Sequence, residues 1–149
     1  MLNILNKNRY KFQEALVKAC EELHYRFTRY HVQYTIALAY IEEGCDLTIC
    51  GKHLRESDTI IFLQPNFCAI LFDNTNEEYG IKAANNVLTR IQNLYFAKHF
   101  YMSVITANDE QSEFQMIHDL FDLMAYALEH NMDNLVVDSS QEIQHQQSV

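Results

Sequence analysis

Two apolar runs separated by a short polar turn constrain the fold of this chain more than any other feature. Residues 59–63 and 67–72 read TIIFL and FCAILF, and Gln64-Pro65-Asn66 stands between them. Runs of β-branched and aromatic residues favour strands, and Pro followed by Asn favours a tight turn. The pattern therefore predicts a β-hairpin with a short loop, buried on both faces.

A nearly continuous apolar segment predicts another strand. Residues 34–41 read YTIALAYI, which is typical of a central strand buried on both sides. Elsewhere apolar residues recur at helical spacing, and two capping boxes open such segments. The expected order is a helix over 8–30, a strand over 34–41, a short helix over 47–54, the hairpin, a helix opened by Thr75-x-x-Glu78, a strand over 100–106, a helix opened by Ser112-x-x-Gln115 and a strand over 135–137. This order predicts an α/β (α+β) fold, with helices flanking a central, mostly antiparallel five-stranded sheet.

The charge of the chain argues against two classes of partner. The chain has 149 residues and a formal net charge of −9 at pH 7, so nucleic acid and anionic membranes would repel it. No apolar run approaches the ~20 residues that a membrane span requires. The four cysteines form neither a CxxC pair nor a Cys/His metal pattern. We therefore expect a cytoplasmic protein with free thiols, no metal and no cofactor.

Two separate stretches resemble the GGDEF (diguanylate cyclase) family in register. The first runs from LRESD at residues 54–58 through the hairpin to AILF at residues 69–72. The family commonly reads L-R-x-S-D, a strand, G-G-D/E-E-F and then A-I-L-L. The second stretch, residues 121–136, is similar to the family's A-D-x-A-L-Y-x-A-K-x-x-G-R-N-x-V. Its matching positions are Asp122, Tyr126, Asn134 and Val136.

The resemblance covers roughly residues 30–138. It implies a nucleotidyl cyclase, ferredoxin-like palm and a place in bacterial cyclic di-GMP signalling. It also implies three parts: an N-terminal helix over 1–30, a GGDEF-like domain over 31–138 and a tail over 139–149. The tail is polar and expected to be disordered.

The residues that the resemblance assigns to catalysis are replaced in this chain. In place of G-G-D/E-E-F stand Gln64, Pro65, Asn66, Phe67 and Cys68. Proline removes a backbone N–H and adds a ring where the nucleotide would approach. Neither Asn nor Phe is a good ligand for a hard divalent cation, so the metals that support phosphoryl transfer would be lost.

Further departures lie outside the hairpin. The first strand ends in Glu42 and Glu43 where the family has D-x-D, and only thirteen residues run from Glu42 to Leu54. Glu129 stands at the family's phosphate-contacting Lys, which reverses the charge beside a triphosphate. The resemblance therefore predicts a catalytically degenerate member that is not an enzyme.

One family feature is retained. Arg55-x-x-Asp58 is similar to the R-x-x-D site at which the family binds its product, cyclic di-GMP. An Arg fork can grip phosphate or the guanine Hoogsteen edge, and a carboxylate can accept from guanine N–H groups. The alternative interpretation is a solvated turn that precedes a strand.

The N-terminal helix also has two interpretations. Its apolar stripe, Phe12, Leu16, Ala19 and Leu23, either forms the seam of a homodimer or packs on the core of its own domain.

Three functions follow from these observations. The leading hypothesis is a non-catalytic regulatory or protein-interaction module with an unidentified protein partner. The second is a cyclic di-GMP receptor that uses Arg55 and Asp58. The third is an enzyme of unrelated chemistry in the altered cleft at residues 64–67.

Overall fold

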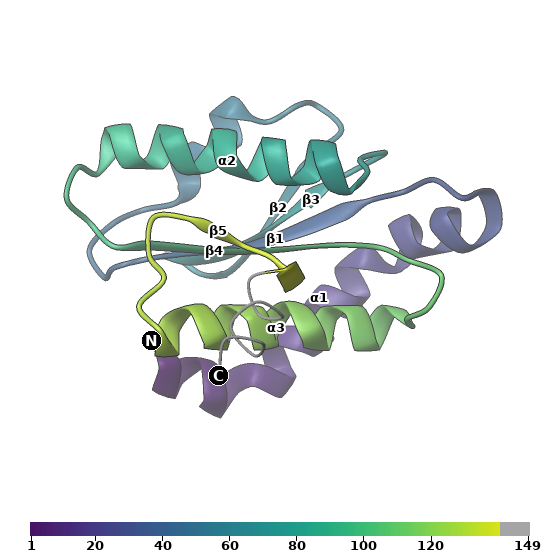
Figure 1. Ribbon diagram of the computed structural model, residues 1–149, viewed down its shortest axis with the longest axis horizontal. Helices are drawn as coiled ribbons and strands as arrows, with labels where there is room; N and C mark the ends of the chain where they lie inside the picture. The colour runs from purple at the N-terminus through teal and green to yellow at the C-terminus, as the bar shows by residue number, and fades with distance from the viewer. Residues whose placement is uncertain (141–149) are drawn as a thin grey trace.

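A five-stranded sheet with helices on both faces forms the molecule (Figure 1). The computed structural model describes residues 1–140, except for the side chain of His53. The elements are α1 (Leu2–Tyr30), β1 (Thr35–Ile41), the 3-10 helix η1 (Thr48–His53), β2 (Thr59–Gln64), β3 (Phe67–Phe72), α2 (Glu77–Leu94), β4 (Phe100–Thr106), α3 (Glu113–Glu129) and β5 (Val136–Val137). Helices α1 and α3 cover one face, and α2 covers the other. The predicted fold class is confirmed.

Strand β1 lies at the centre of the sheet, in the order β2-β3-β1-β4-β5. It pairs antiparallel with both β3 and β4, whereas β4 and β5 are parallel. Because side chains alternate along a strand, Ile36 and Leu38 enter the core beneath α1 and α3, while Ala37 and Ala39 enter the core beneath α2. The nearly continuous apolar sequence of β1 is explained by this burial on both sides.

The hairpin is only partly as predicted. Every residue of β3 is buried, but β2 is half-exposed along its length because it forms an edge of the sheet. The ladder between β2 and β3 also shifts register between Phe62 and Gln64, so Leu63 sits in a bulge. The prediction of burial on both faces is therefore correct for β3 and wrong for β2.

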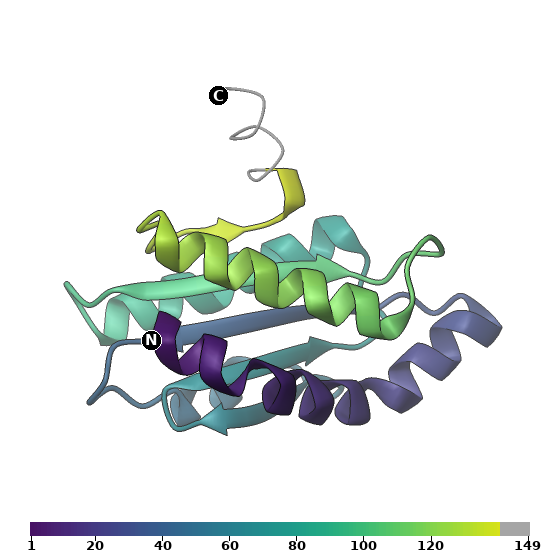
Figure 2. The same ribbon diagram turned by 90° about the horizontal axis from the view of Figure 1, so that it is seen from below.

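Helix α1 begins at Leu2, earlier than predicted, and packs along α3 (Figure 2). Phe12 and Leu16 are buried in the chain's own core. Arg9 donates from Nη2 to Asp122 Oδ1 at 2.5 Å and to the His118 carbonyl at 2.9 Å, which fastens α1 to α3. These contacts contradict a homodimer seam formed by Phe12 and Leu16, and support the alternative of packing within the domain.

The two later helices show how capping sets their starts. Ser112 caps α3 as predicted, with its hydroxyl accepting from Gln115 N. For α2 the cap is Asn76, whose side chain accepts from Tyr79 N, and not the predicted Thr75. Thr75 instead donates to the Asp73 carbonyl, inside the connection between β3 and α2.

None of the helices in residues 1–140 has the length and apolar character that crossing a membrane requires. Of the predicted tail, residues 141–149 lie outside the described residues.

Candidate functional site

The turn of the hairpin is fastened to the end of β1. Asn66 Nδ2 donates to the Ile41 carbonyl at 2.9 Å, and Ile41 N donates to the Asn66 carbonyl at 3.1 Å. Pro65 is exposed and Gln64 is half-buried. The three turn residues therefore form a fixed surface at the end where β1 stops.

The other two residues of the altered signature belong to the core. Phe67 and Cys68 have no exposed surface. The Phe67 ring meets Phe12 edge-on at 5.5 Å and Phe121 at 6.3 Å between centroids, and burial raises the pKa of the Cys68 thiol. Phe67 packs in the core beneath α1 and α3, and Cys68 packs in the core beneath α2. Neither side chain is available to a ligand at the turn.

A histidine between two carboxylates lies at the same end of the sheet. His99 precedes β4, Glu42 follows β1, and Asp133 lies between α3 and β5. His99 Nδ1 is 2.5 Å from Asp133 Oδ2, and His99 N donates to Glu42 Oε1 at 2.7 Å. The hydrogen bond to Asp133 and the charges of Asp133 and Glu42 raise the pKa of His99, against a smaller effect of desolvation. The arrangement favours a bound proton on the imidazole.

Sequence reasoning considered Glu42 but missed His99 and Asp133. The signal was the pairing of β1 with β4, which puts Ile41 opposite Phe100 and so brings the residues that follow β1 beside those that precede β4. Within residues 1–140, no group of three or more His, Cys, Asp or Glu side chains is placed to hold a metal ion.

Two tyrosines form a stacked pair next to this histidine cluster. Tyr40 and Tyr101 are cross-strand partners, with ring centroids 6.0 Å apart and planes 29° apart. Burial raises the pKa of both phenols, and neighbouring carboxylates, Glu42 among them, add to the increase. The aromatic surface therefore lies in a negative field, which disfavours phosphate beside it.

Arg55 and Asp58 form a closed pair at the opposite end of the sheet. Arg55 donates from Nη2 to Asp58 Oδ1 at 3.0 Å and from its backbone N to Asp58 Oδ2 at 3.0 Å. The Asp58 side chain is only 3% exposed, whereas that of Arg55 is 57% exposed. The carboxylate is consequently engaged by Arg55, and only the guanidinium faces solvent.

Arg55 also joins two segments of the chain. Its Nη2 donates to the Asp73 carbonyl at 3.0 Å and to Thr75 Oγ1 at 2.8 Å, both in the connection between β3 and α2. Because Phe67 and Asp73 lie at opposite ends of β3, this pair is about 20 Å from the hairpin turn. The structure thus separates the two predicted sites and does not combine them.

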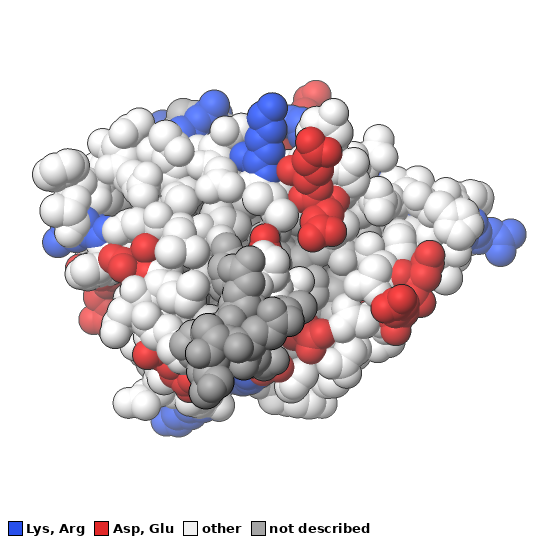
Figure 3. All heavy atoms as spheres, viewed as in Figure 1, with Lys and Arg blue, Asp and Glu red and all other residues white. Residues whose placement is uncertain are grey.

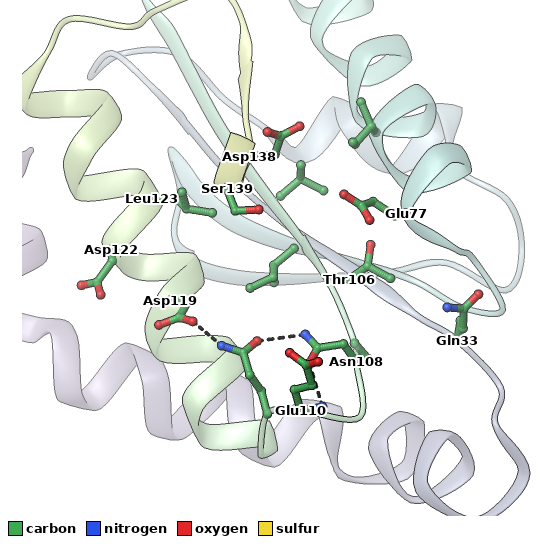
Figure 4. Close-up of a pocket in the computed structure, with 15 residues that line it drawn as sticks. Gln33, Glu77, Thr106, Asn108, Glu110, Asp119, Asp122, Leu123, Asp138 and Ser139 are labelled. Atoms are coloured by element: carbon green, nitrogen blue, oxygen red, sulfur yellow. Dashed lines mark hydrogen bonds between the residues drawn. The ribbon is translucent and has the colours of Figure 1, made fainter. Parts of the chain in front are cut away.

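A cavity of about 620 Å³ opens where β4 ends, between α2 and α3 (Figure 4). None of residues 64–68 is among the described residues that line it, and neither is Arg55. Its described lining includes no Lys or Arg, and its carboxylates come from Glu77, Glu110, Asp119, Asp122 and Asp138. On this face of the molecule the basic side chains lie toward the rim (Figure 3). Such a lining disfavours phosphate-containing ligands in this cavity.

Comparison with protein-family profiles and with curated proteins finds no match. Solved structures do match. The GGDEF domain of DgcB from Caulobacter crescentus, in complex with c-di-GMP, superposes with a TM-score of 0.71 at 8% identity, covering 86% of this chain and 90% of that one. The chain has the fold of a GGDEF domain.

Two further GGDEF structures bear on function. The active GGEEF domain of a diguanylate cyclase from Vibrio cholerae matches with a TM-score of 0.63 at 14% identity, covering 78% of this chain and 89% of that one. Diguanylate cyclase SiaD from Pseudomonas aeruginosa, in complex with its activator SiaC, matches with a TM-score of 0.63 at 14% identity, covering 85% of this chain and 58% of that one.

The likeness to an active domain corrects the prediction that the chain is not an enzyme. A protein with this fold is described as an active diguanylate cyclase, so the fold is compatible with catalysis. Of the replaced hairpin residues, Phe67 and Cys68 pack in the core, and the replacements do not establish inactivity.

Proposed function

We propose that the chain is a regulatory module of cyclic di-GMP signalling and that it binds the dinucleotide through Arg55. One observation carries the proposal: the Arg55 side chain is 57% exposed while its guanidinium is held in place by acceptors from Asp58, Asp73 and Thr75. Structures of similar fold are described as complexes with this ligand, among them the GGDEF domain of DgcB.

The chemistry of a fixed guanidinium suits such a ligand. Its Nε and Nη2 already donate to Asp58, Asp73 and Thr75, which leaves the two N–H groups of Nη1 to donate to a phosphate or to guanine O6 or N7. A side chain that is already ordered loses less conformational entropy when the ligand binds. The hydrogen bond and charge of Asp58 also raise the pKa of Arg55, which keeps the fork protonated.

Asp58 takes a different role here from the one implied by the resemblance. Its carboxylate is 3% exposed and accepts from Arg55, so it positions the fork and does not meet guanine itself. We therefore expect Asp58→Asn to weaken binding through loss of the fixed Arg55 geometry.

Isothermal titration calorimetry with cyclic di-GMP tests this proposal on the full chain. We expect Arg55→Ala to raise Kd by about 10-fold or more, since a charge-assisted contact is lost. Lys11→Ala is the control, because Lys11 is an exposed cation of α1 beside Phe12, which contacts Phe67 at the opposite end of β3. Absence of heat with the wild-type chain, or equal affinity in Arg55→Ala, contradicts the proposal.

A protein contact is the second candidate, and it is favoured by the connection between α2 and β4. Phe96 in this connection is 89% exposed, and the next residue, Ala97, has a φ of 65°. A left-handed conformation is costly for a residue with a Cβ, and such strain clusters at functional segments. SiaD, of similar fold, is described in complex with a protein activator.

The second candidate requires that Phe96 contact the partner. Pull-down from the native host, read by quantitative mass spectrometry, compares the wild-type chain with Phe96→Ser. Tyr10→Ser is the control, because Tyr10 is an exposed aromatic residue on the distant α1. A protein that is lost only in Phe96→Ser supports the contact, and identical captured sets in all three samples contradict it.

A further inference from the structure

Strand β2 leaves one edge of the sheet open. It hydrogen bonds to β3 on one side, and within residues 1–140 no strand lies on its other side. In Figure 2, α1 is drawn in front of β2 and β3, on one face of the sheet. An edge of this kind presents unpaired backbone N–H and C=O groups to any extended segment that approaches.

The side chains of β2 do not protect this edge. Residues 59–64 read TIIFLQ and contain no charged side chain, whereas natural edges are commonly blunted by Lys, Pro or inward-pointing charges. Ile61 packs toward the α1 and α3 core and Ile60 toward the α2 core. Phe62 is 44% exposed although it is the largest side chain of the strand. The bulge at Leu63 is the one protective device in this strand, and it leaves residues 59–62 regular.

We propose that β2 pairs antiparallel with β2 of a second copy of this chain, about a two-fold axis through Ile61 and perpendicular to the sheet. Ile61 then lies opposite Ile61 of the second copy, and Ile60 lies opposite its Phe62. Directly opposed residues of antiparallel strands share a face. This register therefore sets Ile60 against Phe62 twice on the α2 face and buries the exposed ring.

A register shifted by one residue is disfavoured. It would oppose Ile60 to Ile61, whose side chains are on different faces of the sheet. One copy would then be turned over, with its α2 on the same side as α1 and α3 of the other. The faces of the two copies match in one continuous sheet only when the numbers of two directly opposed residues add up to an even number.

Charge does not oppose the pairing locally at this edge. The net charge of −9 disfavours association of two copies in general, but residues 59–64 carry no charge and add no repulsion at the contact. In the proposed register the two Asp58 residues lie about 20 Å apart along the strands, beyond the Debye length of about 8 Å at physiological salt. Each Asp58 is also paired with its own Arg55. The interface is isologous, as in most homodimers.

Analytical ultracentrifugation of the full chain tests the pairing. We expect a dimer for the wild-type chain and a rise of at least about 100-fold in its dissociation constant for Phe62→Lys, because both copies lose an aromatic contact. Phe96→Lys is the control, since this exposed ring is not in the interface. Circular dichroism checks the fold of each variant. A wild-type monomer at hundreds of micromolar, or a dimer that survives Phe62→Lys, overturns the proposal.

Disulfide trapping tests the register independently of stability. The background is Cys45→Ser, because the other cysteines, Cys20, Cys50 and Cys68, are buried. Directly opposed residues have Cα atoms 4.5–5.5 Å apart, within disulfide range. We expect Ile61→Cys to give a covalent dimer on oxidation. Thr59→Cys should not, because its two copies would lie about 14 Å apart. Failure of Ile61→Cys, or equal trapping at Thr59→Cys, overturns the register.

Discussion

Gly80 of α2 lies directly against Thr35 at the start of β1. A Cβ on Gly80 would stand 2.5 Å from Thr35 Oγ1 and 2.6 Å from its Cγ2. Thr35 is fully buried, and its hydroxyl bonds the Thr75 carbonyl at 3.1 Å and Thr106 Oγ1 at 2.7 Å. The side chain cannot rotate away without losing these hydrogen bonds, so the close approach of α2 to the sheet depends on glycine here.

Gly80→Ala should therefore destabilise the chain. Overpacking a buried site costs about 1–3 kcal/mol, and the better helix propensity of Ala returns up to about 1 kcal/mol. We expect a net loss of about 1–2 kcal/mol in urea unfolding. Gly51→Ala is the control, because a Cβ there would meet only Ile60 Cδ1, at 3.8 Å. A Gly80→Ala variant as stable as the wild-type chain would show that α2 can shift freely.

The elements that the sequence predicted well are those whose side-chain pattern matches their burial. The apolar runs of β1 and β3 were predicted as strands because both are buried on two faces. The edge position of β2 was not foreseen, since an apolar run looks alike whether or not another strand covers it. The early start of α1 at Leu2 was missed because residues 2–7 carry little helical periodicity, and their order depends on packing such as that of Leu5.

The Phe67 position tests whether the altered signature is a core feature. Phe67→Ala should cost about 3–5 kcal/mol, because a fully buried ring between Phe12 and Phe121 is replaced by a cavity. Pro65→Ala, at the exposed position of the same turn, should change the free energy of unfolding by less than about 1 kcal/mol. Urea titration followed by circular dichroism measures both variants. Comparable effects at the two positions would contradict the assignment of Phe67 to the core.

The candidate site was predictable only in part, because its geometry depends on contacts between distant segments. The R-x-x-D motif identified Arg55 and Asp58 as a pair. It did not indicate that the Asp58 carboxylate would accept hydrogen bonds from Arg55, or that Arg55 would also donate to Thr75. Likewise, His99 and Asp133 meet only because the connection between α3 and β5 returns to the start of β4. A local sequence motif carries no information about contacts between segments that are far apart in the chain.

The cap of α2 provides a third test. Asn76 accepts from Tyr79 N at 2.9 Å, whereas Thr75 is occupied with the Asp73 carbonyl. Asn76→Ala should cost about 1 kcal/mol, and Asn76→Asp should retain most of the stability because Asp is an equally good cap. Thermal unfolding compares the two variants. If Asn76→Asp lost as much as Asn76→Ala, the hydrogen bond to Tyr79 N would not be the stabilising contact.

The pair His99 and Asp133 makes stability depend on pH in a defined direction. The pKa of His99 in the folded chain is raised above its ordinary value of 6.5, first by the hydrogen bond to Asp133 and then by its charge. The folded state therefore holds this proton more tightly than the unfolded state does. The contribution is fully present below about pH 6.5 and is lost as pH rises through the folded pKa.

Replacing His99 isolates this effect from other titrating groups. The pKa of His24 is lowered by burial, so its contribution to stability changes with pH in the opposite sense. In the wild-type chain it partly cancels the effect of His99 on the dependence of stability on pH. We expect the stability difference between the wild-type chain and His99→Gln to be larger at about pH 5.5 than at about pH 8.5. Urea midpoints at the two pH values measure it. Asp133→Asn should reduce the same pH dependence, and a difference that grows with pH would refute the assignment.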